Sequence, residues 1–108
     1  MRLKKRSEFL EVQKGRRVHT GLFVVQSLVR PNADFCRVGF TVSKKVSPSS
    51  VIRNRIRRRL KEAVRLDEGS FPATPMDFVL VARSGALTAP FLTIRAELTK
   101  ALLKAAQY

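Results

Sequence analysis

The order of hydrophobic and polar positions predicts alternating helices and strands along this chain. Apolar residues at helical spacing among Lys, Arg, Glu and Gln predict a short basic helix within Leu3–Val18, with Ser7 as its cap and an end near Gly15. Two segments rich in β-branched and aromatic residues, Gly21–Val29 and Phe35–Val46, predict strands. The first half of the chain is therefore expected to fold as helix, strand, strand.

The segment between these two strands, Arg30–Asp34, has the composition of a turn because it contains proline, asparagine and aspartate. We therefore expect the strands to pair as a hairpin with a loop of about five residues. Gly39, inside the second strand, is the candidate position for a bulge.

The second half of the chain contains the strongest helix signal. Ser47-Pro48-Ser49-Ser50 ends the strand and offers capping hydroxyls to a helix over Val51–Leu66, which we expect Asp67-Glu68-Gly69 to close with a C-terminal glycine. The continuous apolar run Phe78–Ala82 predicts a strand covered on both faces. Thr88-Ala89-Pro90 is typical of a helix start. The apolar stripe of this last helix consists of Phe91, Ile94, Leu98, Leu102 and Ala105.

The order helix, strand, strand, helix, strand, helix predicts an α+β protein, a two-layer sandwich of a small central sheet with helices. A chain of 108 residues suits one domain, so we expect residues 1–108 to form a single domain.

Net charge restricts the partners more than any other property. The chain has 22 Lys and Arg against 8 Asp and Glu, a formal charge of +14, which predicts a polyanionic partner. No apolar run approaches the roughly 20 residues that cross a bilayer, and the basic N-terminus lacks the apolar stretch of a secretory signal. Cys36 is the only cysteine, so no disulfide within the chain is expected. These features predict a cytoplasmic protein without a membrane partner.

Seven cations lie between Arg53 and Arg65, and their distribution around the helix predicts their role. At roughly 100° per residue, a narrow apolar stripe forms on one side, with Arg53 and Arg59 at its shoulders. Glu62 is the only carboxylate in this segment, so the cations have few helical partners and favour an outside anion. The stripe consists of Ile52, Ile56, Leu60 and Ala63, and the opposite side carries Asn54, Arg57, Arg58, Lys61 and Arg65.

These residues resemble a known family. Val42-Ser43-Lys44-Lys45-Val46, followed after a short turn by Arg53-Asn54-Arg55-Ile56, is similar to the signature of the bacterial ribonuclease P protein. The resemblance covers nearly the whole chain, since Leu3–Phe9 resembles the first helix of that family and Asp77–Arg83 its last strand.

The resemblance implies a ribonucleoprotein endoribonuclease whose catalytic RNA, with bound magnesium, removes the 5′ leader of precursor tRNA. The protein would bind both RNAs, hold no metal or other cofactor tightly, and require no protein partner. The resemblance also implies a parallel, left-handed crossover around the arginine-rich helix, against the right-handed rule for such connections. The residues expected to contact the catalytic RNA are Lys44, Lys45, Arg53, Asn54, Arg55, Arg57, Arg58, Lys61 and Arg65.

The family binds the single-stranded leader in a cleft between its first helix and the sheet. The resemblance places Phe9 there with Lys5 and Arg6, whereas Gln13 and Gln26 stand where the family often has aromatic residues. A second interpretation of Phe9 remains open, because an aromatic residue in an amphipathic helix also suits the core.

The sequence offers little for hydrolysis by the protein itself. His19 is the candidate general base, but it has no Cys, His or acidic neighbour at the spacing of a metal site or a triad. We therefore expect no catalytic residue and no metal site. A ribosome-associated structural protein is the main alternative, ahead of a protein nuclease, which would need clustered acids, and a basic membrane-surface protein, which would favour Trp on its apolar face.

Overall fold

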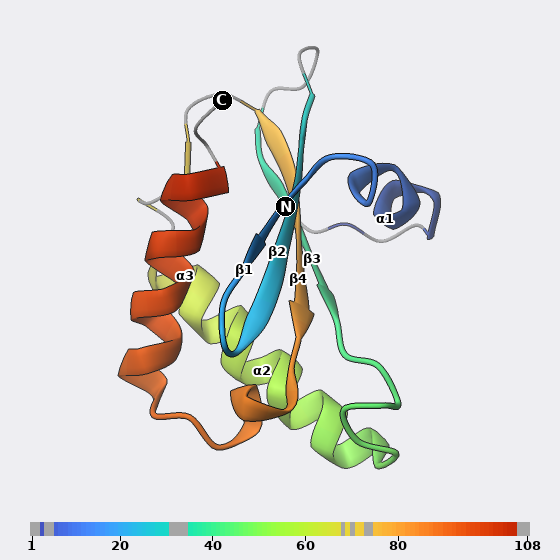
Figure 1. The fold of residues 1–108 in the computed structure, drawn as a ribbon, viewed down its shortest axis with the longest axis vertical. Helices are drawn as coiled ribbons and strands as arrows, with labels where there is room; N and C mark the ends of the chain where they lie inside the picture. Colours follow the sequence, from blue (N-terminus) through green and yellow to red (C-terminus); the bar gives the residue numbers. More distant parts are fainter. Residues whose placement is uncertain are drawn as a thin grey trace.

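The chain folds as a four-stranded sheet with helices on both faces (Figure 1). The computed structural model describes residues 3, 6–30, 35–67, 69, 71–72 and 75–105. A short helix covers one face of the sheet, and two long helices cover the other (Figure 1). The elements are α1 (Arg6–Val12), β1 (Arg16–His19), β2 (Phe23–Val29), β3 (Arg37–Thr41), α2 (Ser50–Leu66), β4 (Met76–Ala82), the 3-10 helix η2 (Ser84–Leu87) and α3 (Phe91–Ala105).

The strand order is β1-β2-β4-β3, with β2 antiparallel to both β1 and β4 and β3 parallel to β4. The prediction that β2 and β3 form a hairpin is therefore wrong. β4 lies between them because its apolar residues, buried on both faces, suit an inner strand, as the continuous run Phe78–Ala82 predicted.

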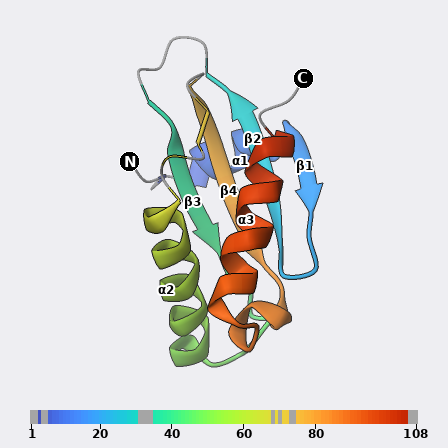
Figure 2. The same cartoon turned by 90° about the vertical axis from the view of Figure 1, so that its left-hand side faces the viewer.

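The connection from β3 through α2 to β4 is left-handed. In Figure 2 the layer of α2 and α3 faces the viewer, β3 and β4 both run downward, and β4 lies to the right of β3. A right-handed crossover would place β4 on the other side of β3. The expectation taken from the family resemblance is confirmed.

Two apolar clusters hold the layers together. The larger lies between the sheet and the helices α2 and α3, and it contains the fully buried Phe23, Phe78, Ile56 and Leu98. The smaller lies under α1 and centres on Leu3, Val12 and Val79. The apolar stripes predicted for both long helices are confirmed, because their central residues are buried.

The fold class is confirmed, with one strand more than expected. The first helix ends at Val12, three residues before the expected end near Gly15, and Arg16–His19 forms β1, a strand that was not predicted. Gly39 pairs in regular register with Val79 and forms no bulge. The predicted turn at Arg30–Asp34 lies largely outside the described residues.

α2 begins at a serine cap, as the sequence predicted. The Ser49 hydroxyl accepts a hydrogen bond from the backbone N–H of Ile52 at 3.3 Å, which satisfies one of the free donors of the first turn. The closing residue is Asp67 and not Gly69, because the Asp67 N–H donates to the carbonyls of Ala63 and Val64. Its side chain also accepts a hydrogen bond from Arg95, which ties the end of α2 to α3.

Candidate nucleic-acid interface

The outer side of α2 presents a basic surface, here called the α2 basic face. Glu62 is its one carboxylate, and it pairs with Arg65, which lowers the pKa of the Glu62 carboxyl. The side chains of Arg55, Arg58, Lys44 and Lys45 form no hydrogen bond or ion pair within the described part of the chain. The exposed members of this face are Asn54, Arg55, Arg58 and Arg65 on the helix, with Lys44 and Lys45 in the turn before it.

Two arginines at the shoulders of α2 have structural contacts instead. Arg53 donates to the carbonyl oxygens of Ser47 and Pro48, both at 2.9 Å, and so holds the turn before the helix. Arg59 donates to the carbonyls of η2 and the following turn, with Ala86 at 2.9 Å. The helical wheel separated these two residues from the exposed side, but only the structure shows what they bind.

Most cations of the α2 basic face have no partner in the described part of the chain, because few carboxylates are available to pair with them. Every carboxylate that the structure describes already accepts from a donor of this chain, and only Glu62 lies on the outer side of α2. The pairs are Glu8 with Arg37, Glu11 with Lys14, Glu62 with Arg65, Asp67 with Arg95, Asp77 with Arg30 and Arg37, and Glu97 with the Gly21 N–H.

α1 crosses the opposite face of the sheet, and Phe9 fixes its approach to β3. A Cβ atom added to Gly39 would lie 2.5 and 2.6 Å from Cε1 and Cζ of Phe9, so the ring rests directly on this glycine. Leu3 joins them by donating its N–H to the Val38 carbonyl at 3.0 Å. Phe9 is half-buried here, so it packs against the smaller core and still has an accessible part.

A charged cluster holds the other flank of α1. Glu8 pairs with Arg37, and Arg37 also donates to the buried Asp77 from Nε at 2.9 Å and Nη2 at 2.7 Å. Arg30 donates to the same carboxylate at 3.3 Å. The hydrogen bond to Asp77 is the main cause that raises the pKa of the Arg37 guanidinium, against the opposing effect of burial. These contacts surround a hollow of about 280 Å³ beside the first turn of α1.

Beside α1 the outer face of the sheet is partly accessible, and we call this surface, together with the facing flank of the helix, the α1 groove. Glu8 and Phe9 stand over Arg37 and Gly39, so the flank of α1 opposite Glu8 faces the next residues of the strands. That flank carries Arg6 and Gln13, both exposed, whereas Leu10 lies on the side of the helix away from the buried Val12 and is 46% exposed. The floor consists of Val24, Val81 and Thr41, which are only half-buried, and β1 forms the far side with Arg17 and His19.

The two predicted binding sites adjoin each other at the edge of the sheet. Phe9 and Gly39 line a hollow of about 140 Å³ together with Arg57 and Lys61, which reach past β3 from α2. Sequence reasoning assigned these residues to separate sites, and no periodicity links Phe9 to Arg57. The tertiary structure therefore joins the α2 basic face to the α1 groove.

The other residues predicted to bind the leader differ in their exposure. Arg6 and Gln13 are exposed beside Phe9, whereas Gln26 is only 6% exposed because α1 covers it. Lys5 lies outside the described residues. Sequence reasoning missed Arg17 and the position of His19 in the α1 groove, because β1 was not predicted. Its register, with Val18 packed on the larger core, shows that these two residues face outward.

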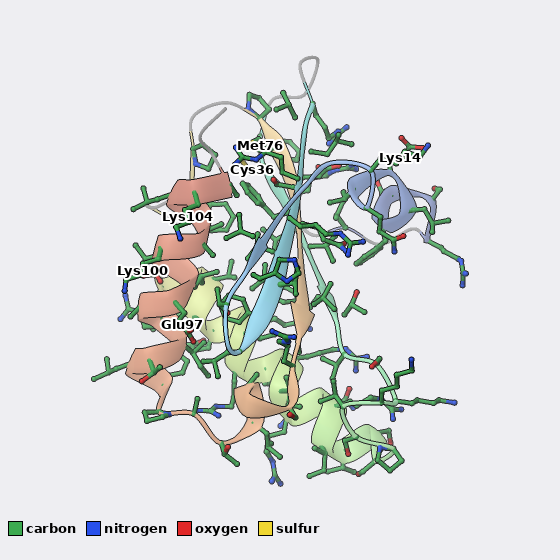
Figure 3. The ribbon with its side chains drawn as sticks, viewed as in Figure 1. Lys14, Cys36, Met76, Glu97, Lys100 and Lys104 are labelled. Atoms are coloured by element: carbon green, nitrogen blue, oxygen red, sulfur yellow. The ribbon has the colours of Figure 1, made fainter. Side chains whose placement is uncertain are left out.

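Cations also lie outside both sites. Figure 3 shows Lys14 at the end of α1 on one side of the sheet, and Lys100 and Lys104 on α3 on the other side. Among the residues that the structure describes, no three His, Cys, Asp or Glu side chains gather in a way that could hold a metal ion. In the same residues, no helix combines the length and the apolar composition that crossing a membrane requires.

This combination defines a class of protein: a small, strongly basic α+β protein with a cationic helix and an open sheet groove, suited to binding RNA. The sequence model of the family described as Ribonuclease P matches residues 1–106. The chain belongs to the ribonuclease P protein family, whose members are components of a ribonucleoprotein endoribonuclease.

Known relatives agree with this family. The ribonuclease P protein component of Gluconacetobacter diazotrophicus is 47% identical over 105 residues, which cover 96% of this chain and 90% of the relative. That of Brucella suis is 45% identical over 108 residues, covering 93% and 76%. The solved RNase P protein of Thermotoga maritima has a TM-score of 0.83 at 28% identity, covering 96% of both chains. That of Staphylococcus aureus has a TM-score of 0.79 at 31% identity, covering 98% and 94%.

Proposed function

We propose that this protein binds two RNAs at once and so assists RNA-catalysed maturation of tRNA. The catalytic RNA of ribonuclease P lies on the α2 basic face, and the 5′ leader of precursor tRNA lies in the α1 groove. The RNA subunit binds the magnesium ions and cleaves the leader, while the protein supplies no catalytic side chain.

The observation that carries the proposal is the imbalance of charge on α2. Arg55, Arg58, Lys44 and Lys45 are exposed and without a partner in the described part of the chain, while the described carboxylates are engaged elsewhere or paired with Arg65. Unpaired cations on one rigid helix repel one another until phosphates neutralise them. RNA is the partner that the family membership favours over a membrane surface or another polyanion.

The α1 groove has the properties that single-stranded RNA requires. It offers the accessible part of Phe9 for stacking a base, an apolar floor of Val24 and Val81, and Arg6 on the flank of the helix for phosphates. Duplex RNA would need a different surface, because its bases are already stacked on one another. These features support the leader as the occupant.

Multiple-turnover cleavage of precursor tRNA tests the proposal. Reactions with the catalytic RNA alone, the protein alone and both together are compared at low magnesium concentration. Only the combined reaction should be efficient, because the protein adds leader affinity and screens RNA phosphates that magnesium would otherwise have to neutralise. Cleavage by the protein alone, or no stimulation of the RNA, would contradict the proposal.

A further inference from the structure

His19 stands on the side of the α1 groove that faces Phe9. In β1, Val18 packs against the larger core, so the alternation of the strand turns His19 to the outer face, directly opposite Val24 in β2. β1 is an edge strand, and the imidazole is exposed. It makes no hydrogen bond or ion pair within the described part of the chain. Its position is therefore not explained by the fold.

The surroundings of His19 suit a nucleotide base. Val24 and Val81 continue the outer face beside it as a flat apolar floor. Arg17 lies two residues earlier on the same face, and Arg83 lies near the end of β4, where it donates to the Thr20 carbonyl at 3.2 Å. A base stacked on the imidazole would thus have apolar contacts below it and cations for its phosphates beside it.

The distance between His19 and Phe9 indicates two separate contacts. Phe9 rests on Gly39 in β3, and three inter-strand spacings of about 4.8 Å place β1 roughly 14 Å from β3. One base cannot touch both rings over that distance. A strand lying across the sheet would contact Phe9 with one base and His19 with another.

We propose that His19 stacks on a base of the single-stranded RNA in the α1 groove, as a second ring that positions the leader opposite Phe9. This proposal rests on the proposed function of the groove. It assigns His19 a positioning role through its flat face, not through charge and not through catalysis.

Variants of His19 separate stacking from contact with a phosphate. The holoenzyme is reconstituted with the catalytic RNA, and its affinity is measured for precursor tRNA with and without a leader. His19→Ala should weaken leader-dependent affinity about fivefold to tenfold, at the lower end of the range for stacked aromatic side chains. His19→Phe should retain most of the affinity, and His19→Lys should lose it. The opposite order, with the lysine variant active and the phenylalanine variant weak, would overturn stacking.

A matched control and a spectroscopic measurement complete the test. Phe35→Ala removes an exposed ring before β3, outside the groove, and should leave leader affinity unchanged. His19 is the only histidine of the chain, so its imidazole proton resonances in the NMR spectrum are assigned without ambiguity. A single-stranded RNA of leader sequence should shift them upfield, and the same RNA with abasic sites should not. Equal shifts with both RNAs, or no shift, would refute the proposal.

Failure of this proposal differs from failure of the proposed function. If Phe9→Ala abolishes the preference for leader while His19→Ala keeps it, the groove binds leader without the second ring. If neither variant changes the preference, the leader lies elsewhere, and the groove itself is wrongly assigned.

Discussion

At the scale of single residues, Phe9 and Gly39 show how packing and binding share one side chain. The ring can approach β3 this closely because Gly39 has no Cβ, and it packs against the apolar cluster of Leu3, Val12 and Val79. The accessible part of the same ring lines the hollow that Arg57 and Lys61 share. The geometry therefore allows Phe9 to belong to the core and to a binding surface at the same time.

Gly39→Ala should act by displacing Phe9. The new Cβ would meet the ring at 2.5 Å, and the ring can turn outward because it is only half-buried. We expect Gly39→Ala and Phe9→Ala each to reduce leader-dependent affinity, about ten- to a hundredfold for the loss of the ring. Binding assays on both single variants and the double variant would measure this.

The double variant supplies the control. Once Phe9 is truncated, the added methyl group of Gly39→Ala no longer meets the ring, and only the Cβ of Leu3, at 3.1 Å, remains close. The two effects should therefore be less than additive. Gly69→Ala, where a Cβ meets nothing within 4 Å, is the matched glycine variant and should behave as wild type. Fully additive effects of Gly39→Ala and Phe9→Ala would show that the glycine acts independently of the ring. A Phe9→Ala variant with a lower melting temperature and unchanged preference for leader would assign Phe9 to the core alone.

At the scale of elements, α2 divides its arginines between contacts within the fold and the exposed surface to which we assign RNA binding. Arg58 is exposed and without a partner in the described residues, whereas its neighbour Arg59 holds η2 and the turn before α3. One residue along the helix, about 100° of rotation, separates the two roles. α2 lies near the edge strand β3 (Figure 2), and its residues Arg57 and Lys61 line the hollow beside Phe9.

Charge reversal on α2 should remove RNA binding without unfolding the protein. Arg57, Arg58 and Lys61 lie away from the buried stripe, so changing all three to Glu should weaken binding to the catalytic RNA strongly with little change in melting temperature. Arg59→Ala is the contrasting variant, since it leaves carbonyls of η2 unpaired and should cost roughly 1–3 kcal/mol of stability. Gel-shift assays and thermal melting would compare them. Full RNA binding by the triple variant would remove α2 from the interface.

At the scale of the whole molecule, the charge of +14 is distributed over both sides of the sheet. Lys14 lies at the end of α1, and Lys100 and Lys104 lie on α3, the opposite layer (Figure 3). Under the proposed function, cations outside the two sites raise the rate of encounter with RNA, whereas the α2 basic face and the α1 groove determine how RNA is oriented. The net charge and the two sites therefore contribute differently to binding.

Binding to the catalytic RNA should depend steeply on salt. If about six phosphates are neutralised, the slope of log affinity against log salt concentration should be roughly −4 to −5. Titrations from low to moderate salt would measure it, and removing cations by the triple α2 variant should make the slope shallower. A slope near zero would mean that charge does not drive the association.

The sequence determined those features of this protein that depend on local burial. The helical spacing of apolar residues was sufficient to predict α2 and α3, and the continuous apolar run Phe78–Ala82 was sufficient to predict the doubly buried β4. The scarcity of carboxylates between Arg53 and Arg65 was sufficient to predict the α2 basic face. The tertiary structure decided which strands pair, because β2 and β3 each pair with β4 from a distant part of the chain. The tertiary structure also makes Arg16–His19 a strand, β1, although this segment is too short to show a period of apolar residues. Pairing of β1 with β2 places His19 in the groove. Periodicity reports how one segment is buried, whereas the groove depends on which segments become neighbours.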